Sequence, residues 1–325
     1  MKHSRLFTPL RIFPALVFSA IAALLPGLTR AQKPATNASE PAREGCVWKV
    51  SDGDSTLYLA GSVHLLREED HPVSPAYDQA YSDSDELIFE VDMGEMTSPE
   101  GIQKMQQLGL FPPDDSLDKH LKSETIEAIR KYLGTHQSGA MLAMALPRMK
   151  PGMVFLSISS LEAMKLNARP ELGLELVYFQ KSQADSKPSR GLETIEFQMN
   201  LFDQMSDQEI DELLARTLTD SNEMSKVLEE LIAHWHAGDA EKLDELLNKE
   251  MEQGGEKLKK LLLTGRNEAW IPQIEKALKG SKNTMVLVGA AHLVGKEGVI
   301  DLLRKKGYTV EKVKPAAAKA LKKAA

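Results

Sequence analysis

Two histidines in the sequence follow the same local pattern. Residues 57–64 (LYLAGSVH) and 285–292 (MVLVGAAH) each read as four residues of apolar strand, a glycine, two small or apolar residues and a histidine. Glycine lets the backbone turn without the penalty of a Cβ, and a side chain just beyond a strand end projects into the crevice where open α/β sheets hold ligands. Because neutral imidazole binds zinc and related divalent ions and also serves as a general base, His64 and His292 are candidates for one shared site.

Glu90 is the third candidate, because it ends the apolar run 87–89 (LIF). A carboxylate among apolar neighbours needs a partner, since burying it unpaired is costly. Two histidines and a carboxylate are the usual ligands of a hydrolytic metal that keeps one position open for water. The alternative, in which each histidine only caps a strand or hydrogen-bonds within a turn, stays open at this point.

The elements that must position these residues lie at the two ends of the chain. Their pattern predicts a mixed α/β fold, with a small mixed β-sheet formed by N- and C-terminal strands and a long helical insertion at about 98–278. The expected strands are 47–50, 57–60, 86–91, 284–288 and 308–313, with a hairpin turn at 52–54 (DGD) and helices at 75–82 and 296–306.

The first residues are typical of an export signal. Lys2, Arg5 and Arg11 precede an apolar stretch at 12–28, and small residues then allow cleavage near Ala31, so we expect residues 1–31 to be removed and the protein to be periplasmic or secreted. The alternative is an uncleaved anchor, because the apolar stretch approaches the ~20 residues that span a bilayer. After cleavage we expect no stable membrane span.

The remaining chain divides by composition. Residues 32–45 are rich in Ala, Pro, Asn, Ser and Thr and predict a flexible linker. Residues 46–314 form the expected folded domain, and the Ala/Lys tail 315–325 is expected to be disordered. A single cysteine, Cys46, permits no intramolecular disulfide, so stability must come from core burial.

Charge and hydrophobicity exclude several classes of protein. With 42% hydrophobic and 27% charged residues, the chain is neither disordered nor collagenous nor a multi-span membrane protein. Without residues 1–31 it carries 36 basic and 47 acidic residues, a formal charge of −11. That balance argues against a nucleic-acid partner, which needs a basic face. The partner expected for a hydrolytic site is instead a peptide or small-molecule substrate. The oligomeric state stays open.

Seven ordered motifs resemble those of the TraB/GumN family, which is similar to the Tiki metalloproteases of animals. They lie at 48–50 (WKV), 57–64, 87–92 (LIFEVD), 191–194 (GLET) with Gln198, Trp235 with 238–239 (GD), 266–267 (RN) with Trp270, and 288–293 (VGAAHL). The resemblance implies a mixed α/β core in which His64, Glu90 and His292 hold a divalent metal ion of the zinc, manganese or cobalt type.

The resemblance also makes Glu193, Arg266 and Asn267 candidate catalytic residues beside Glu90. Glu193 could assist proton transfer. Arg266 could clamp a substrate carboxylate or stabilise an oxyanion, since guanidinium binds such groups in a fork, or it could form only a structural salt bridge. Asp92 either orients a histidine or opens the loop that follows the strand.

Two functional hypotheses follow. The first is an exported metal-dependent hydrolase, similar to a peptidase, acting on a peptide or similar amide or ester. The second is a non-catalytic envelope protein that binds a peptide or glycan in the same crevice.

Four methionines were weighed as a copper site and set aside. Met141, Met144, Met149 and Met153 lie in an apolar helical stretch, where thioether side chains usually fill gaps in a core. We therefore expect them to be buried.

Overall fold

The computed structural model describes residues 43–52, 56–136, 139–219 and 221–315. The predicted signal peptide at 1–31 and almost all of the predicted tail lie outside these residues. The described residues include 43–45, just before the predicted boundary at 46. Arg43 donates hydrogen bonds to the carbonyls of Glu69, Asp70 and Pro72, and the Gly45 amide donates to His236.

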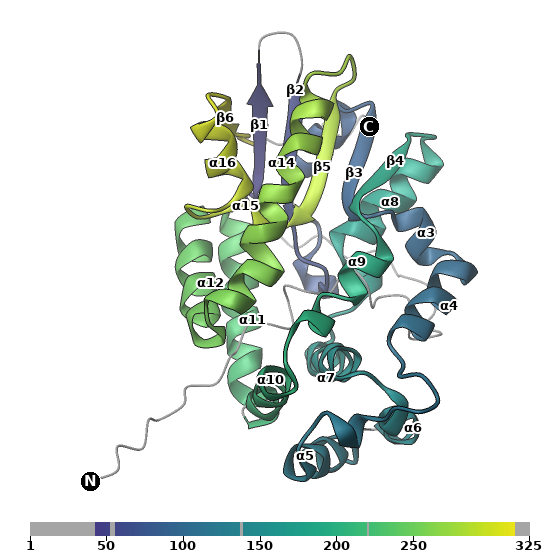
Figure 1. Cartoon of the computed structure of the whole chain (residues 1–325). Helices are drawn as coiled ribbons and strands as arrows, with labels where there is room; N and C mark the ends of the chain where they lie inside the picture. The colour runs from purple at the N-terminus through teal and green to yellow at the C-terminus, as the bar shows by residue number, and fades with distance from the viewer. Residues whose placement is uncertain (1–42, 53–55, 137–138, 220, 316–325) are drawn as a thin grey trace, which may run out of the picture.

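The core of the protein is one six-stranded mixed sheet (Figure 1), which confirms the predicted fold class. The strand order is β4-β3-β5-β2-β1-β6, and β2, β3, β4 and β5 run parallel while β1 is antiparallel to β2 and β6. The strands are β1 (Val47–Ser51), β2 (Thr56–Ser62), β3 (Glu86–Val91), β4 (Ser189–Glu193), β5 (Thr284–Gly289) and β6 (Thr309–Lys312).

The predicted terminal strands therefore share one sheet. β1 and β2 form the expected hairpin, with Ser51 opposite Thr56. β5 lies between β3 and β2 and is buried at every residue, which explains its continuous apolar sequence, because a parallel strand covered on both faces has no solvent side.

β4 corrects the prediction of a long helical insertion at about 98–278, because this segment also contributes a strand to the sheet. This strand lies inside the insertion, at the edge of the sheet, parallel to β3. Its sequence SRGLE lacks an apolar run, because an edge strand that is mostly half-buried needs only one inward residue, here Leu192. Period-2 patterning is too weak over such a segment to distinguish it from a loop.

The rest of the insertion is helical, and most of its helices gather at one end of the sheet. Figure 1 shows α5, α6, α7 and α10 beyond the carboxyl ends of the parallel strands, while α14 crosses in front of the sheet. Among the described residues, no helix has the length and apolarity needed to cross a bilayer. The helices before β4 are α2 (Pro75–Ser82), α3 (Met93–Thr97), α4 (Pro99–Leu108), α5 (Ser123–Leu133), α6 (Gly139–Ala145), α7 (Pro151–Lys165) and α8 (Leu174–Ala184). Those after it are α9 (Ile195–Met199), α10 (Asp207–Thr219), α11 (Ser221–Ala237), α12 (Ala240–Gly254), α13 (Glu256–Lys259), the π-helical turn η7 (Lys260–Thr264), α14 (Gly265–Leu278), α15 (Ala290–Leu293) and α16 (Val299–Lys305).

The methionine prediction is half wrong. Met149 and Met153 are buried as expected, but Met141 and Met144 are 77% and 86% exposed. Both lie on α6, a seven-residue helix that packs against α5 and leaves its other side open to solvent.

Candidate active site

The candidate site lies where the parallel strands end. β2 ends at Ser62, two residues before His64, and β5 ends at Gly289, after which the short helix α15 carries His292. The β2–β5 register places Ser62 opposite Gly289, so the two motifs leave the sheet side by side. Glu90 lies near the end of β3, on the other side of β5.

The three predicted metal ligands converge. Nε2 of His64 and Nε2 of His292 each lie 3.9 Å from the same oxygen, Oε1 of Glu90. That oxygen also accepts a 2.8 Å hydrogen bond from the Gly289 amide. All three side chains are buried.

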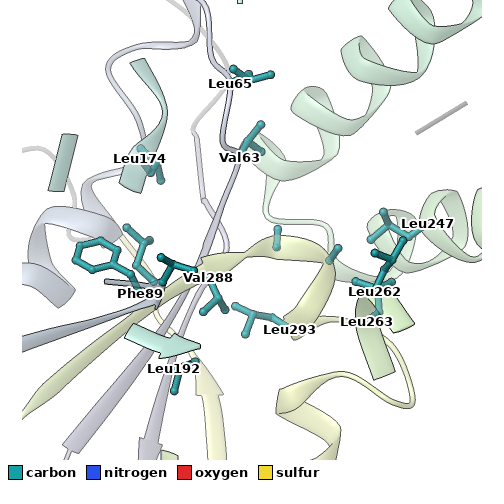
Figure 2. Packing of buried hydrophobic residues seen from close by; sticks show 14 of the residues in the cluster. Val63, Leu65, Phe89, Leu174, Leu192, Leu247, Leu262, Leu263, Val288 and Leu293 are labelled. Carbon is teal, nitrogen blue, oxygen red and sulfur yellow. The ribbon is translucent and has the colours of Figure 1, made fainter. Parts of the chain in front are cut away.

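An apolar shell encloses this end of the sheet. Figure 2 labels Val63, Phe89, Val288 and Leu293, each next in sequence to a residue of the site, together with Leu262 and Leu263 from the π-helical turn. All of them are buried. Polar groups surrounded in this way are strongly desolvated, so their interactions with one another dominate their chemistry.

Each histidine is oriented by a partner at its other ring nitrogen. Nδ1 of His292 lies 2.7 Å from Oδ1 of Asn267, whose Nδ2 donates to the carbonyl of Glu297. That second bond fixes the amide, so the imidazole carries its proton on Nδ1 and leaves Nε2 as the acceptor. Asn267 thus belongs to the site through His292.

The partner of His64 is Glu175, which the sequence analysis did not identify. Nδ1 of His64 lies 2.7 Å from Oε1 of Glu175, a charged contact rather than a well-aligned hydrogen bond, and Ser62 Oγ donates to the same oxygen. Glu175 opens α8 inside the run 174–177 (LELV), so its signal is the one that identified Glu90, a carboxylate among apolar residues.

Arg266 contacts three other residues of the site, Glu90, His292 and Glu193. Its NH2 group lies 2.7 Å from Oε2 of Glu90, and its NH1 donates to Nε2 of His292 at 3.1 Å. Its Nε and NH2 also bind the two oxygens of Glu193 at 2.9 and 2.8 Å. The predicted salt bridge is therefore present, and the guanidinium also faces the imidazole nitrogen, so both interpretations of Arg266 remain.

Glu193 is held by four hydrogen bonds. Besides the two from Arg266, Trp270 Nε1 donates to its Oε1 at 2.8 Å and Gln198 Nε2 donates to its Oε2 at 3.0 Å. With donors on both oxygens, the carboxylate is better placed to anchor Arg266 than to accept a proton from a substrate. Gln198 also approaches Oε2 of Glu90 at 3.4 Å.

A π-helical turn precedes Arg266. NH1 of Arg266 donates to the carbonyl of Leu262 within η7 at 3.1 Å. π-Helical turns leave backbone carbonyls without their usual partners and are frequent at functional sites. This one sets the start of α14 and so the position of the guanidinium.

Asp92 lies outside this network. Its side chain accepts hydrogen bonds from the amides of Gly94 and Glu95 and caps the N-terminus of α3. Neither role considered for it is correct, because α3 begins directly after it at Met93 and Asp92 caps that helix instead of opening a loop.

The pKa values of the two histidines are shifted in opposite directions. Burial lowers the pKa of His292 to about 3, and the Arg266 guanidinium acts in the same direction. Burial also acts to lower the pKa of His64, but Glu175 and then Glu90 outweigh it, so that pKa lies above its ordinary value. For Glu90, burial acts to raise the pKa, yet Arg266 and the two imidazoles hold it well below its usual range.

The donor set fits a divalent ion if Arg266 releases Nε2 of His292, to which its NH1 now donates. Nε2 of His64 is buried and has no hydrogen-bond partner in the described chain, and a Cβ on Gly289 would lie 3.2 Å from Glu90 Oε1 and 3.4 Å from His64 Nε2, so the glycine keeps this space open. Ligands on a tetrahedral ion with ~2 Å bonds are about 3.4 Å apart. As they stand, the described His, Cys, Asp and Glu side chains contain no group of three placed to hold a metal ion. The two distances of 3.9 Å exceed the ideal spacing by about 0.5 Å, while the unpartnered nitrogen and the open space at Gly289 favour an ion.

Fold and site together define a mixed α/β protein with a buried centre of two histidines, a carboxylate and a guanidinium at the ends of parallel strands. The profile of the TraB/PrgY/gumN family matches residues 46–312, and the chain belongs to that family. A relative in zebrafish (Danio rerio), metalloprotease TIKI2, is 23% identical in an alignment 306 residues long that covers 79% of this chain. The match spans 58% of the length of that relative. No solved structure matches significantly.

Proposed function

We propose that the protein is a metal-dependent hydrolase, similar to a peptidase, that acts on a peptide or a similar amide or ester. The observation that supports this most is the convergence of His64 Nε2 and His292 Nε2 on one oxygen of Glu90 in a buried site. The zebrafish relative named as a metalloprotease supports the same class of reaction.

His64, Glu90 and His292 would hold a divalent ion of the zinc, manganese or cobalt type. When bound, such an ion supplies a water of lowered pKa as the nucleophile and polarises the carbonyl to be cleaved. Carboxylate and amide partners of metal-bound histidines fix the ring orientation and raise ligand basicity, which is the role of Glu175 toward His64 and of Asn267 toward His292.

Arg266 would stabilise the negative charge that develops on the substrate oxygen through its NH1 group, which now donates to His292 Nε2 and would be released if that nitrogen held the ion. Its guanidinium is fully buried, and burial in a low-dielectric site strengthens such an interaction. Glu193 holds the guanidinium in place through two hydrogen bonds. This assignment moves Glu193 from proton transfer, its predicted role, to positioning.

Export forms part of the proposal. The basic start, the apolar stretch at 12–28 and the small residues before position 32 support a cleaved signal and a periplasmic or secreted protein. Fractionation of cells that express the full chain, with N-terminal sequencing of the product, tests this. A product that keeps residues 1–31 in the membrane fraction contradicts it.

Hydrolysis of a mixed peptide library tests the reaction. We expect the mature protein to release product, and chelation or the double substitution His64→Ala/His292→Ala to abolish release while the far-ultraviolet circular dichroism is unchanged. The matched control removes two other histidines, His71→Ala/His234→Ala, and should keep full activity. Product formation that survives both chelation and the double substitution would exclude the proposal.

A binding protein is the second candidate, and one observation favours it. Arg266 already occupies Glu90 Oε2 and lies against His292 Nε2, so the site is satisfied without an ion on that side. This alternative expects ligand binding that survives chelation and no product across the library. Cleavage that is lost in Glu90→Gln with the fold intact excludes it.

A further inference from the structure

We propose that a cavity between α9 and the η7–α14 segment receives an apolar side chain of a peptide substrate that also carries a carboxylate. This inference rests on the proposed hydrolase function and names its substrate class. The cavity has a volume of about 310 Å³. Its apolar wall consists of Phe197, Leu201 and Leu261, and its basic residues are Lys257, Lys260 and Arg266.

The cavity borders the site through Arg266. A second, larger cavity of about 540 Å³ is lined by Asn267 and Ala291, but Asn267 contacts Nδ1 of His292, the nitrogen that faces away from Glu90. Arg266 instead contacts Nε2 of His292 and Oε2 of Glu90. The smaller cavity therefore shares with the site the residue that contacts Nε2 of His292 and Oε2 of Glu90, whereas the larger cavity shares the residue that contacts Nδ1.

Both walls of the cavity also carry residues of the site. On α9, Phe197 in the cavity is followed by Gln198, which contacts Glu90 and Glu193. On the other wall, η7 supplies Lys260 and Leu261 one turn before Arg266. A substrate with one side chain in the cavity would thus place its adjoining amide at the site.

The lining favours one large apolar side chain. Phe197 is 43% exposed although it is aromatic, while Leu201 is 2% exposed, so a ligand would cover an open aromatic surface against a buried apolar wall, which is favourable. A volume near the low end of ligand pockets suits a leucine- or phenylalanine-sized group rather than a large ligand.

The basic residues favour a carboxylate beside that apolar group. Lys257 lies 2.6 Å from Glu209 and is neutralised. Lys260 forms no ion pair with any described residue, in a chain whose overall charge is negative. Its ammonium group can therefore pair with a carboxylate of the ligand, either a C-terminal one or an acidic side chain.

The test uses the mature protein and labelled nonapeptides of Ala and Gly that carry one Leu, Phe or Ala at the central position. We expect kcat/KM for the Leu and Phe peptides to exceed that for the Ala peptide, and Phe197→Ala to remove about 10- to 100-fold of this preference, the range for lost apolar groups in a pocket. Leu110→Ala, at a similarly exposed residue outside the cavity, is the control.

The carboxylate is tested with three versions of the Leu peptide: a free C-terminus next to Leu, the same peptide amidated, and an amidated peptide with Glu after Leu. Lys260→Gln should lower kcat/KM only for the versions that bear a carboxylate. A loss for the peptide with the free C-terminus identifies a C-terminal carboxylate, and a loss for the amidated Glu peptide identifies an acidic side chain. Lys296→Gln, in the larger cavity, is the matched control.

Equal kcat/KM for the Leu and Ala peptides, or a loss that appears with Lys296→Gln and not with the Phe197 and Lys260 variants, overturns the assignment of the cavity. Fluorescence anisotropy of the same peptides measures their binding to the cavity separately from their cleavage. Preferential binding of Leu and Phe peptides without any cleavage supports the cavity and contradicts the hydrolase; cleavage without preference does the reverse.

Discussion

The two histidine motifs have nearly the same sequence but lie in different surroundings. His64 lies against a carboxylate, Glu175, and its Nε2 has no partner in the described chain. His292 lies against an amide, Asn267, and its Nε2 accepts from Arg266. The repeated pattern therefore sets where each imidazole leaves the sheet, while helices distant in sequence set its charge and its partners.

Because of this difference, the two sides of the site suit different ligands. On the side of His64, two carboxylates, those of Glu175 and Glu90, face the imidazole, which suits a cation. The side of His292 holds a neutral imidazole next to a guanidinium, which suits an anionic substrate oxygen. The predictions below change one side at a time.

The largest expected effect comes from Arg266→Met. The substitution leaves two buried carboxylates, Glu90 and Glu193, without their cation, and breaking such a buried pair costs about 3–5 kcal/mol. Urea unfolding measures the free energy of unfolding of each variant. Arg169→Met is the control, because its ion pairs with Glu68 and Glu171 are exposed and are worth about 0–1 kcal/mol. Equal losses in the two variants would contradict the buried network.

Glu175→Gln tests the side of His64. Loss of the carboxylate removes the group that orients the imidazole, and such outer partners typically contribute 10- to 100-fold in metal affinity. Titration with Zn²⁺ in a competing chelator measures the change. Glu162→Gln removes another buried carboxylate, the one beside Tyr132 and Lys165, and should leave the affinity unchanged. An unchanged affinity in Glu175→Gln would remove Glu175 from the site.

The motif glycines should respond differently to alanine. At Gly61 a Cβ would lie 3.1 Å from both Ala290 and Cys46, so Gly61→Ala overpacks the core and should cost about 1–3 kcal/mol without altering the donors. At Gly289 it would enter the space between Glu90 and His64, so Gly289→Ala should weaken metal binding more than stability. Thermal unfolding and metal titration of both variants check this. Identical behaviour of the two would mean that the open space at Gly289 has no function.

The smallest effect concerns His120, a histidine with two carboxylate partners, as His64 has, but near the surface. Burial acts to lower its pKa, but Asp207 and Asp115, at 2.9 and 3.0 Å, outweigh it and raise the pKa. A raised pKa in the folded state gives stability that is present below the unfolded pKa and is lost as the pH rises through the folded value. His120→Gln should therefore cost up to ~1 kcal/mol at about pH 5 and almost nothing at about pH 9. His234→Gln is the control, and a difference that grows with pH would contradict the assignment.

The parts of the fold that the sequence predicted are those with strong local patterns. β2, β3 and β5 are apolar runs that end in a polar residue or a glycine, so both their existence and the convergence of His64, Glu90 and His292 followed from the chain. β4 was missed because an edge strand needs no apolar run.

The other parts of the site depend on long-range contacts that leave little local signal. Arg266 and Glu193 are 73 positions apart, and their pairing depends on how α14 lies over the sheet. The π-helical turn η7 has no sequence pattern of its own. Glu175 did have a local signal, because it is a carboxylate between two leucines. In a helix, however, such a glutamate usually lies on the solvent-facing side. Only its contact with His64 shows its role.

Metal binding tests the central claim most directly. Elemental analysis and titration of the mature protein with Zn²⁺, Mn²⁺ and Co²⁺ should give one bound ion per chain for at least one of these metals, lost in His64→Ala/His292→Ala and kept in His71→Ala/His234→Ala. Equal metal content in all three proteins, or no binding by the folded wild type, would contradict a site built from His64, Glu90 and His292.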